Sequence, residues 1–269
     1  MIKVHIIHTG TVKVDRAIPL NEKNPLAVTG LFRSKDKSMI LPVSCYLIEH
    51  PKGKILIDTG WDTKYATERP KEWFGLVDKI SGPSIKEDEG VNSKLASLGL
   101  RDDDLKAVYL SHMDFDHASG ICLVKNAGGI YAAEEEIKDA KKSKFRYVDT
   151  WTGIADISSF SYKNTGLGPV GRSFDVFDDG SVVLINTPGH SHGLFAVKIT
   201  GENGKYMILA NDGAYVQDSF DKHIIPGFTV DKSLAKKSLE WLIACKQEPD
   251  CLEVLANHDP GVKEHVVNL

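Results

Sequence analysis

The sequence predicts an α/β protein in which two similar halves pack sheet against sheet and carry their helices on the outside. Strand-like runs followed by a helical pattern occur in the first half of the chain and again in the second. Five buried strand patterns end in a carboxylate or an imidazole, as expected if their ends meet at one site. No solenoid repeat or obvious linker interrupts the chain, so we expect one domain spanning residues 1–269.

The first half of the chain begins with strands and continues into helices. Apolar or alternating runs predict strands at residues 2–10, 39–50, 54–60 and 105–111. The PKG sequence before the third of these strands indicates a hairpin turn. Helical patterns lie at residues 91–100 and, with a charged surface, at 132–144. A loop-rich stretch is expected from Phe145 to about Gly171.

The second half of the chain repeats the strand pattern. A DDG turn signal divides two strands within residues 174–189. Further strands are expected within residues 193–200, 205–212 and 251–260. The strongest helical pattern covers residues 231–247, with Asp231 as its N-cap and Ala235, Leu239 and Leu242 on one face.

Composition limits the classes of partner. Hydrophobic residues make up 42% of the chain and charged residues 26%, as in ordinary globular proteins, and the formal net charge is -4. A negative charge gives no electrostatic attraction to nucleic acid or to an anionic membrane, and no apolar run approaches the ~20 residues of a membrane span. The four cysteines form no CxxC pair, and the first residues show no signal-peptide pattern. We therefore expect a cytoplasmic protein, monomeric or homodimeric, that binds neither nucleic acid nor membrane.

The polar residues at the strand ends form a metal-ligand inventory. The densest stretch, LSHMDFDHASG at residues 110–120, follows a buried strand directly. Single residues follow four other strands, Asp58 among them, although Asp58 is expected to tie its loop through backbone hydrogen bonds. Imidazole and carboxylate ligands suit zinc, iron or manganese. The candidate ligands are His112, Asp114, Asp116, His117, His190, Asp212 and His258.

The spacing of these residues suits two ions. In an extended loop His112 and Asp114 point the same way, while Asp116 and His117 turn toward a second ion. Asp212 has two oxygens and can bridge. Two ions ~3.5–4 Å apart hold a hydroxide between them and polarise a carbonyl or phosphoryl oxygen.

Motifs in a fixed order along nearly the whole chain carry a family resemblance. They are HTG, ILIDTG, LASLGLRDDDLKAVYLSHMDFDHASG, TPGHSHG, ANDGAY and NHDP. In this order they resemble the metallo-β-lactamase superfamily, and within it the N-acyl-homoserine-lactonase group. The resemblance implies an αβ/βα four-layer sandwich of the metallo-β-lactamase type, in agreement with the two halves inferred above.

The resemblance also assigns roles to residues. It implies that His112, Asp114 and His190 bind one divalent ion, that Asp116, His117 and His258 bind the second, and that Asp212 bridges both. Asp116 and Tyr215 are the implied catalytic residues, and Tyr215 matches the tyrosine that helps to hold the substrate carbonyl in these lactonases.

Asp114 departs from the family pattern, since most of the family's lactonases have histidine there. Some superfamily members, such as the flavodiiron proteins, carry a carboxylate at this position. The family implies zinc, whereas the added negative charge and hard oxygen of an aspartate favour iron or manganese.

The expected function is a metal-dependent hydrolase that opens a lactone ring with a metal-bridging hydroxide, with an N-acyl-homoserine lactone as candidate substrate. The alternatives are a thioester or phosphodiester hydrolase of the same superfamily, or a non-catalytic sensor that keeps the fold. The GHSHG sequence at residues 189–193 also fits a serine-hydrolase elbow, but a strand pattern follows it where that elbow needs a helix. Trp73 and Phe74 either cover the core or shape a groove for the substrate.

Overall fold

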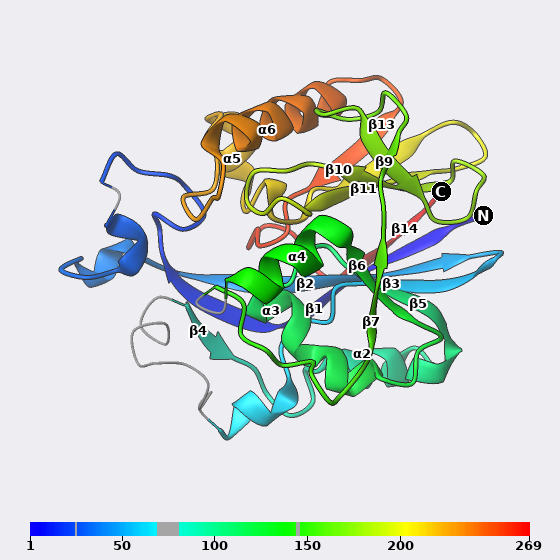
Figure 1. The fold of residues 1–269 in the computed structure, drawn as a ribbon, viewed down its shortest axis with the longest axis horizontal. Helices are drawn as coiled ribbons and strands as arrows, with labels where there is room; N and C mark the ends of the chain where they lie inside the picture. The colour runs from blue at the N-terminus through cyan, green and yellow to red at the C-terminus, as the bar shows by residue number, and fades with distance from the viewer. Residues whose placement is uncertain (25, 69–80, 144–145) are drawn as a thin grey trace.

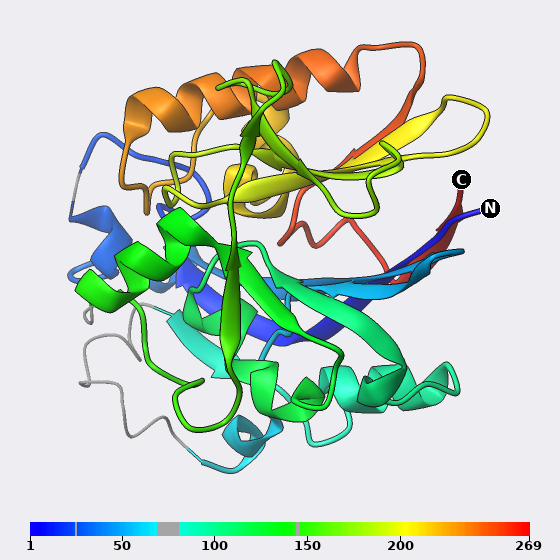
Figure 2. The same ribbon diagram turned by 45° about the vertical axis from the view of Figure 1, so that its right-hand side comes forward.

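A computed structural model describes residues 1–24, 26–68, 81–143 and 146–269. Two sheets pack face to face, and helices lie on their outer faces (Figures 1 and 2). This arrangement confirms the four-layer α/β sandwich predicted from the sequence. Trp73 and Phe74 lie outside the described residues, so the two readings of them, a cover for the core or a groove for the substrate, both stay predictions.

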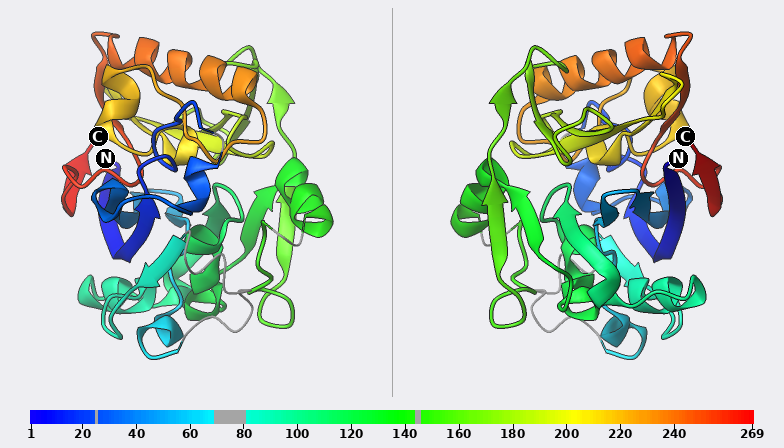
Figure 3. Two further views of the ribbon diagram at one scale, coloured as in Figure 1. Left: turned by 90° about the vertical axis from the view of Figure 1, so that its left-hand side faces the viewer. Right: turned by 90° about the vertical axis from the view of Figure 1, so that its right-hand side faces the viewer.

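Among the described residues the first sheet has eight strands, in the order β14-β1-β2-β3-β5-β6-β7, with β4 paired to β1. Their bounds are β1 (Lys3–Asp15), β2 (Ser38–His50), β3 (Gly53–Ile57), β4 (Ser81–Ser84), β5 (Leu105–Leu110), β6 (Ile130–Ala133), β7 (Ile157–Phe160) and β14 (His265–Asn268). The first and last strands pair antiparallel, so the two termini lie side by side at one end (Figure 3).

The second sheet has six strands in the described part of the chain, in the order β13-β12-β11-β10-β9-β8. Their bounds are β8 (Lys163–Asn164), β9 (Arg172–Asp175), β10 (Val182–Asn186), β11 (Phe195–Thr200), β12 (Tyr206–Leu209) and β13 (Cys251–Leu255). The α-helices within the described ranges are α2 (Val91–Ser97), α3 (Phe115–Ala118), α4 (Glu134–Lys142), α5 (Gln217–Asp221) and α6 (Lys232–Lys246).

The period of two along each strand builds the layers. In β2, Tyr46 and Ile48 face the second sheet, whereas Cys45 and Leu47 pack on the opposite side with Leu95 of α2. Both sets are fully buried, which explains why β2 is almost continuously apolar. On the other side of the sandwich, the apolar face of α6 covers the second sheet.

The predicted elements fare unevenly. The Asp231 cap is confirmed, since its carboxylate accepts the Leu234 N–H at 2.9 Å. The loop-rich stretch from Phe145 to about Gly171 is wrong in part, because it contains β7 and β8. These strands have four and two residues, too few for an alternation to stand out, and edge pairing stabilises them instead. No helix in the described ranges is long and apolar enough to cross a membrane.

Strand direction places the site. β3, β5 and β6 run parallel, so their carboxyl ends share one edge of the first sheet. In the second sheet β12 and β13 run parallel. Strand β10 has the same direction, because both β10 and β12 pair antiparallel with β11. The loops that leave these strands carry the polar residues singled out above, as expected from the sequence.

Candidate metal centre

The structure brings the seven predicted metal-binding residues together in overlapping groups, and within each group the ligand atoms lie within 4.8 Å of one another. The first group is His112, Asp114 and His190, and the second group is Asp116, His117 and His258. A third set links them, namely His112, His117 and Asp212. Side chains from four separate strand ends therefore converge as the sequence predicted.

The loop after β5 divides its residues between the two groups. Asp114 is extended, with φ of -65° and ψ of 156°, and the short helix α3 begins at the next residue. The turn separates Asp114 from Asp116 and His117, as predicted, although a helical turn and not an extended chain does this. Phe115 is buried against Trp61, with ring centroids 5.3 Å apart, and this contact anchors the turn in the core.

Fixed acceptors orient the histidines of the second group. The His117 Nδ1 atom lies 2.8 Å from the Asp58 carboxylate, and the His258 Nδ1 atom lies 2.8 Å from the Pro42 carbonyl oxygen. In the neutral ring each Nδ1 therefore carries the proton, and each Nε2 presents its lone pair to the site. Asp58 also accepts the Ser111 N–H at 2.7 Å, which confirms its predicted structural role and adds the contact with His117.

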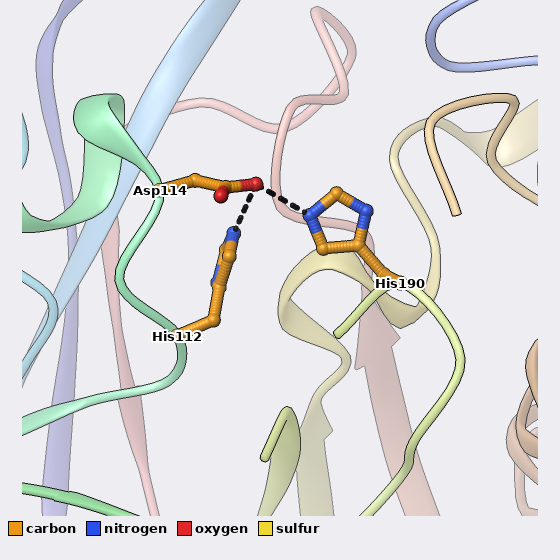
Figure 4. Close-up of side chains that lie close together, drawn as sticks. All are labelled: His112, Asp114 and His190. Carbon is orange, nitrogen blue, oxygen red and sulfur yellow. Dashed lines mark hydrogen bonds and ion pairs between the residues drawn. The ribbon is translucent and has the colours of Figure 1, made fainter. Parts of the chain in front are cut away.

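Hydrogen bonds from Nδ1 orient the histidines of the first group in a similar way, while the Nε2 atom of His112 has no partner among the described residues. His190 Nδ1 donates to the Phe228 carbonyl oxygen at 2.7 Å. Figure 4 shows Asp114 between the two histidines, with its Oδ2 atom 2.9 Å from His190 Nε2 and 3.5 Å from His112 Nε2. His112 Nδ1 in turn lies 3.0 Å from the Ser111 hydroxyl.

Arg146 joins the first group, and the sequence reasoning missed it. Its Nε and Nη2 atoms donate to the two oxygens of Asp114, both at 2.7 Å. Nη2 also lies 2.9 Å from His190 Nε2, and Nη1 donates to the His190 carbonyl oxygen at 2.7 Å. Arg146 stands alone in a stretch read as loop, so the only signal for it was Asp114, a carboxylate that needs a cation once buried.

The two groups differ in their electrostatics. In the first, burial alone raises the pKa of Asp114, but Arg146 outweighs it and holds that pKa well below its usual range. The pKa of His190 is lowered, by burial and by the same guanidinium. In the second, burial alone lowers the pKa of His117 and of His258, yet the nearby carboxylates, Asp212 above all, raise both. The second group thus has an excess of negative charge that draws protons or cations.

The donor atoms fit a metal ion in the second group. The Nε2 atom of His117 in this group is buried with no hydrogen-bond partner among the described residues. The same is true of the Nε2 atom of His112 in the first group, which lies 3.7 Å from Asp212 Oδ2. An orphaned buried acceptor is costly unless something binds it. Asp212 lies at the same spot, with its Oδ1 atom 3.3 Å from His117 Nε2 and 3.2 Å from His258 Nε2. Imidazole nitrogens beside carboxylate oxygens are a donor set for zinc, iron or manganese.

Tyr215 lies over the centre. Its ring stacks on His258 at a centroid distance of 4.8 Å and meets His190 edge-on at 5.8 Å. Burial and the carboxylates of Asp212 and Asp116 raise its pKa well above the usual value. The phenol therefore stays protonated and can donate a hydrogen bond.

Glu136 of α4 braces the centre and was also missed in the sequence. Its buried carboxylate accepts the Met113 N–H at 3.0 Å and the Gly193 N–H at 3.2 Å. These N–H groups belong to the loop after β5 and the loop after β10, so one side chain ties together the loops that carry His112 and His190. Within a helix that reads as exposed, one buried glutamate gives no distinct pattern.

The GHSHG stretch is not a nucleophile elbow. Strand β11 begins at Phe195, where a serine-hydrolase elbow requires a helix. The buried Ser191 hydroxyl also has no hydrogen-bond partner among the described residues, so no base is placed to activate it.

Comparisons with known proteins agree with this geometry. A family model described as the metallo-beta-lactamase superfamily matches residues 39–250. The chain belongs to this superfamily. The resemblance inferred from the order of the motifs is therefore confirmed.

Relatives of the chain are lactonases. N-acyl homoserine lactonase AttM of Rhizobium radiobacter is 27% identical over 268 residues, covering 96% of this chain and 94% of the relative. An N-acyl homoserine lactonase of Bacillus cereus is 28% identical over 212 residues, covering 78% and 79%. A solved N-acyl homoserine lactone hydrolase, with N-hexanoyl-L-homoserine at its catalytic metal centre, has a TM-score of 0.75 at 24% identity, covering 96% of this chain and 93% of that one. The last likeness shows a shared fold.

Proposed function

We propose that this protein is a metal-dependent hydrolase that opens lactone rings, with an N-acyl-homoserine lactone as the candidate substrate. The observation that carries the proposal is the second group, where oriented Nε2 lone pairs and carboxylates meet below a protonated tyrosine. The lactonases among the relatives, which cover most of the chain, support the substrate class.

The metal ligands we propose come from the set predicted from the sequence. Asp116, His117 and His258 would hold one ion, with the Asp212 carboxylate beside the two histidines as a further ligand. A bound divalent ion supplies Lewis acidity toward the ester carbonyl and makes a nucleophile from water at neutral pH. Zinc is the metal that the resemblance implies, while the oxygen-rich donor set keeps iron and manganese as alternatives. The family implies a second ion at the first group.

The protein's own side chains position the reaction. Asp58 and the Pro42 carbonyl oxygen fix the tautomers of His117 and His258, so the metal-binding atoms need no rearrangement. Tyr215, held in place by its stack on His258, donates its O–H to the carbonyl oxygen as negative charge develops there. Because its pKa is raised, it keeps this proton through the neutral range.

A ring-opening assay tests this proposal. Purified protein is given N-hexanoyl-homoserine lactone, and the product acid is measured by chromatography before and after chelation and after addition of zinc, manganese or iron. We expect ring opening that chelation abolishes and one of these metals restores. A metal-loaded protein that leaves lactones intact contradicts the substrate class; a matched thioester and a phosphodiester in the same panel then test the alternatives.

A further inference from the structure

We propose that Arg146 fills the first group in place of a metal ion, so that the protein holds its ion in the second group alone. The inference rests on the proposed metal-dependent function and departs from the two-ion centre that the family implies. Arg146 lies 32 positions from Asp114 in the chain, and none of the motifs includes it.

The guanidinium engages the atoms that a metal ion would need. It binds both oxygens of Asp114 in a parallel fork at 2.7 Å, the strongest geometry that an arginine and a carboxylate adopt. Its Nη2 atom points at the Nε2 lone pair of His190 from 2.9 Å. Two of the three ligands in the first group, Asp114 and His190, therefore already have a cationic partner. Figure 4 shows how closely Asp114 lies to His112 and His190.

Arg146 is built into this position and does not merely reach it from the surface. Its side chain is only 7% exposed. The guanidinium carbon lies 4.8 Å from the ring centroid of Phe228 and 5.2 Å from that of Tyr147, so aromatic faces contact it as well. Backbone carbonyl groups complete the arrangement. Arg146 Nη1 donates to the His190 carbonyl oxygen, and the Phe228 carbonyl oxygen accepts from His190 Nδ1.

A metal ion and this guanidinium exclude each other from the first group. Binding an ion there requires the fork to Asp114 to break and leaves a buried guanidinium a few ångströms from a dication, where like charges repel strongly. The single negative charge of Asp114 is already balanced by the arginine. No arginine contacts the second group in the described residues, and its carboxylates have no fixed cation.

Asp114 and Arg146 explain each other. A histidine at position 114 offers no pair of oxygens to a guanidinium fork, so the two-bonded contact of Arg146 requires the aspartate. The aspartate at position 114 then selects a different cation for the first group, namely the guanidinium of Arg146 in place of a metal ion.

Metal counting by elemental analysis tests the inference. The protein is saturated with zinc or manganese, freed of excess by gel filtration and assayed without substrate, so the result does not depend on lactonase activity. We expect one ion per chain in the natural protein and two in Arg146→Ala combined with Asp114→His, a pair of changes that leaves no unpaired buried charge. Arg172→Ala is the matched control, because Arg172 contacts Glu135 and the Tyr162 ring instead, and it should keep one ion.

The outcomes separate the two proposals. Two ions per chain in the natural protein overturn the arginine assignment and leave the lactonase proposal untouched. One ion in both the natural protein and the double variant also overturns it, since Arg146 then excludes nothing. A protein with one ion that opens no lactone contradicts only the substrate. Melting temperature gives a second readout: added metal should raise it further in the double variant than in the natural protein.

Discussion

The two halves of the metal centre are built from the same residue types and yet differ in charge balance. The first group pairs Asp114 with a buried arginine, whereas Asp116 of the second group faces histidines alone. Asp212 lies between the two groups and contacts histidines of both. The pKa of His190 accordingly falls, while those of His117 and His258 rise. A ligand-like cluster therefore has to be judged by the cations it already holds as well as by its donor atoms.

Single alanine substitutions in the two groups should give the sharpest contrast. His117→Ala removes an oriented donor from the second group, so we expect the metal to be lost and lactone hydrolysis to fall by more than about 100-fold, beyond the usual effect of a supporting residue. His190→Ala should leave metal content unchanged, since its Nε2 already faces Arg146. Elemental analysis measures the metal content of both variants. Equal metal loss in the two would contradict the proposal that only the second group holds an ion.

The carboxylate behind His117 should matter next. Asp58→Ala removes the acceptor that holds His117 Nδ1–H at 2.8 Å. We expect metal affinity to fall on the order of 10- to 100-fold, as for other residues that orient a ligand histidine. Competition with a chromogenic chelator measures the affinity. Asp15→Ala is the control, because Asp15 is a buried carboxylate that pairs with Arg33; a similar loss of metal in that variant argues against a specific role for Asp58.

Tyr215 separates positioning of metal from positioning of substrate. Tyr215→Phe keeps the ring that stacks on His258 and loses only the O–H donor. We expect kcat/KM for the lactone to fall about 10- to 100-fold, the equivalent of a hydrogen bond of ~1.5–3 kcal/mol to developing charge. Metal content and melting temperature should not change. Unchanged kinetics in this variant exclude Tyr215 from catalysis.

The brace between the loops should have the smallest effect on chemistry and the clearest effect on stability. Glu136→Ala leaves the N–H groups of Met113 and Gly193 buried without an acceptor, which costs about 1–3 kcal/mol of unfolding free energy. Glu136→Gln keeps one amide oxygen as acceptor and should lose less. Urea denaturation of both variants measures the difference, and an alanine variant as stable as the natural protein refutes the brace.

Much of this architecture could be predicted from sequence for identifiable reasons. Long buried strands such as β2 have strong apolar patterns. The ligand residues after β5 and β12 stand out because each is a polar stretch that directly follows an apolar strand. The short edge strands β7 and β8 have no such pattern. Arg146 and Glu136 were missed because their roles arise from tertiary contacts with distant loops, and no local spacing of residues encodes those contacts.

The most direct test is a crystal structure of the metal-loaded natural protein with anomalous diffraction data collected at the absorption edge of the bound metal. One anomalous peak is expected, next to Asp116, His117, His258 and Asp212, with the Arg146 fork still on Asp114. Two peaks, with the second between His112, Asp114 and His190 and the guanidinium displaced, would contradict the assignment of different cations to the two groups.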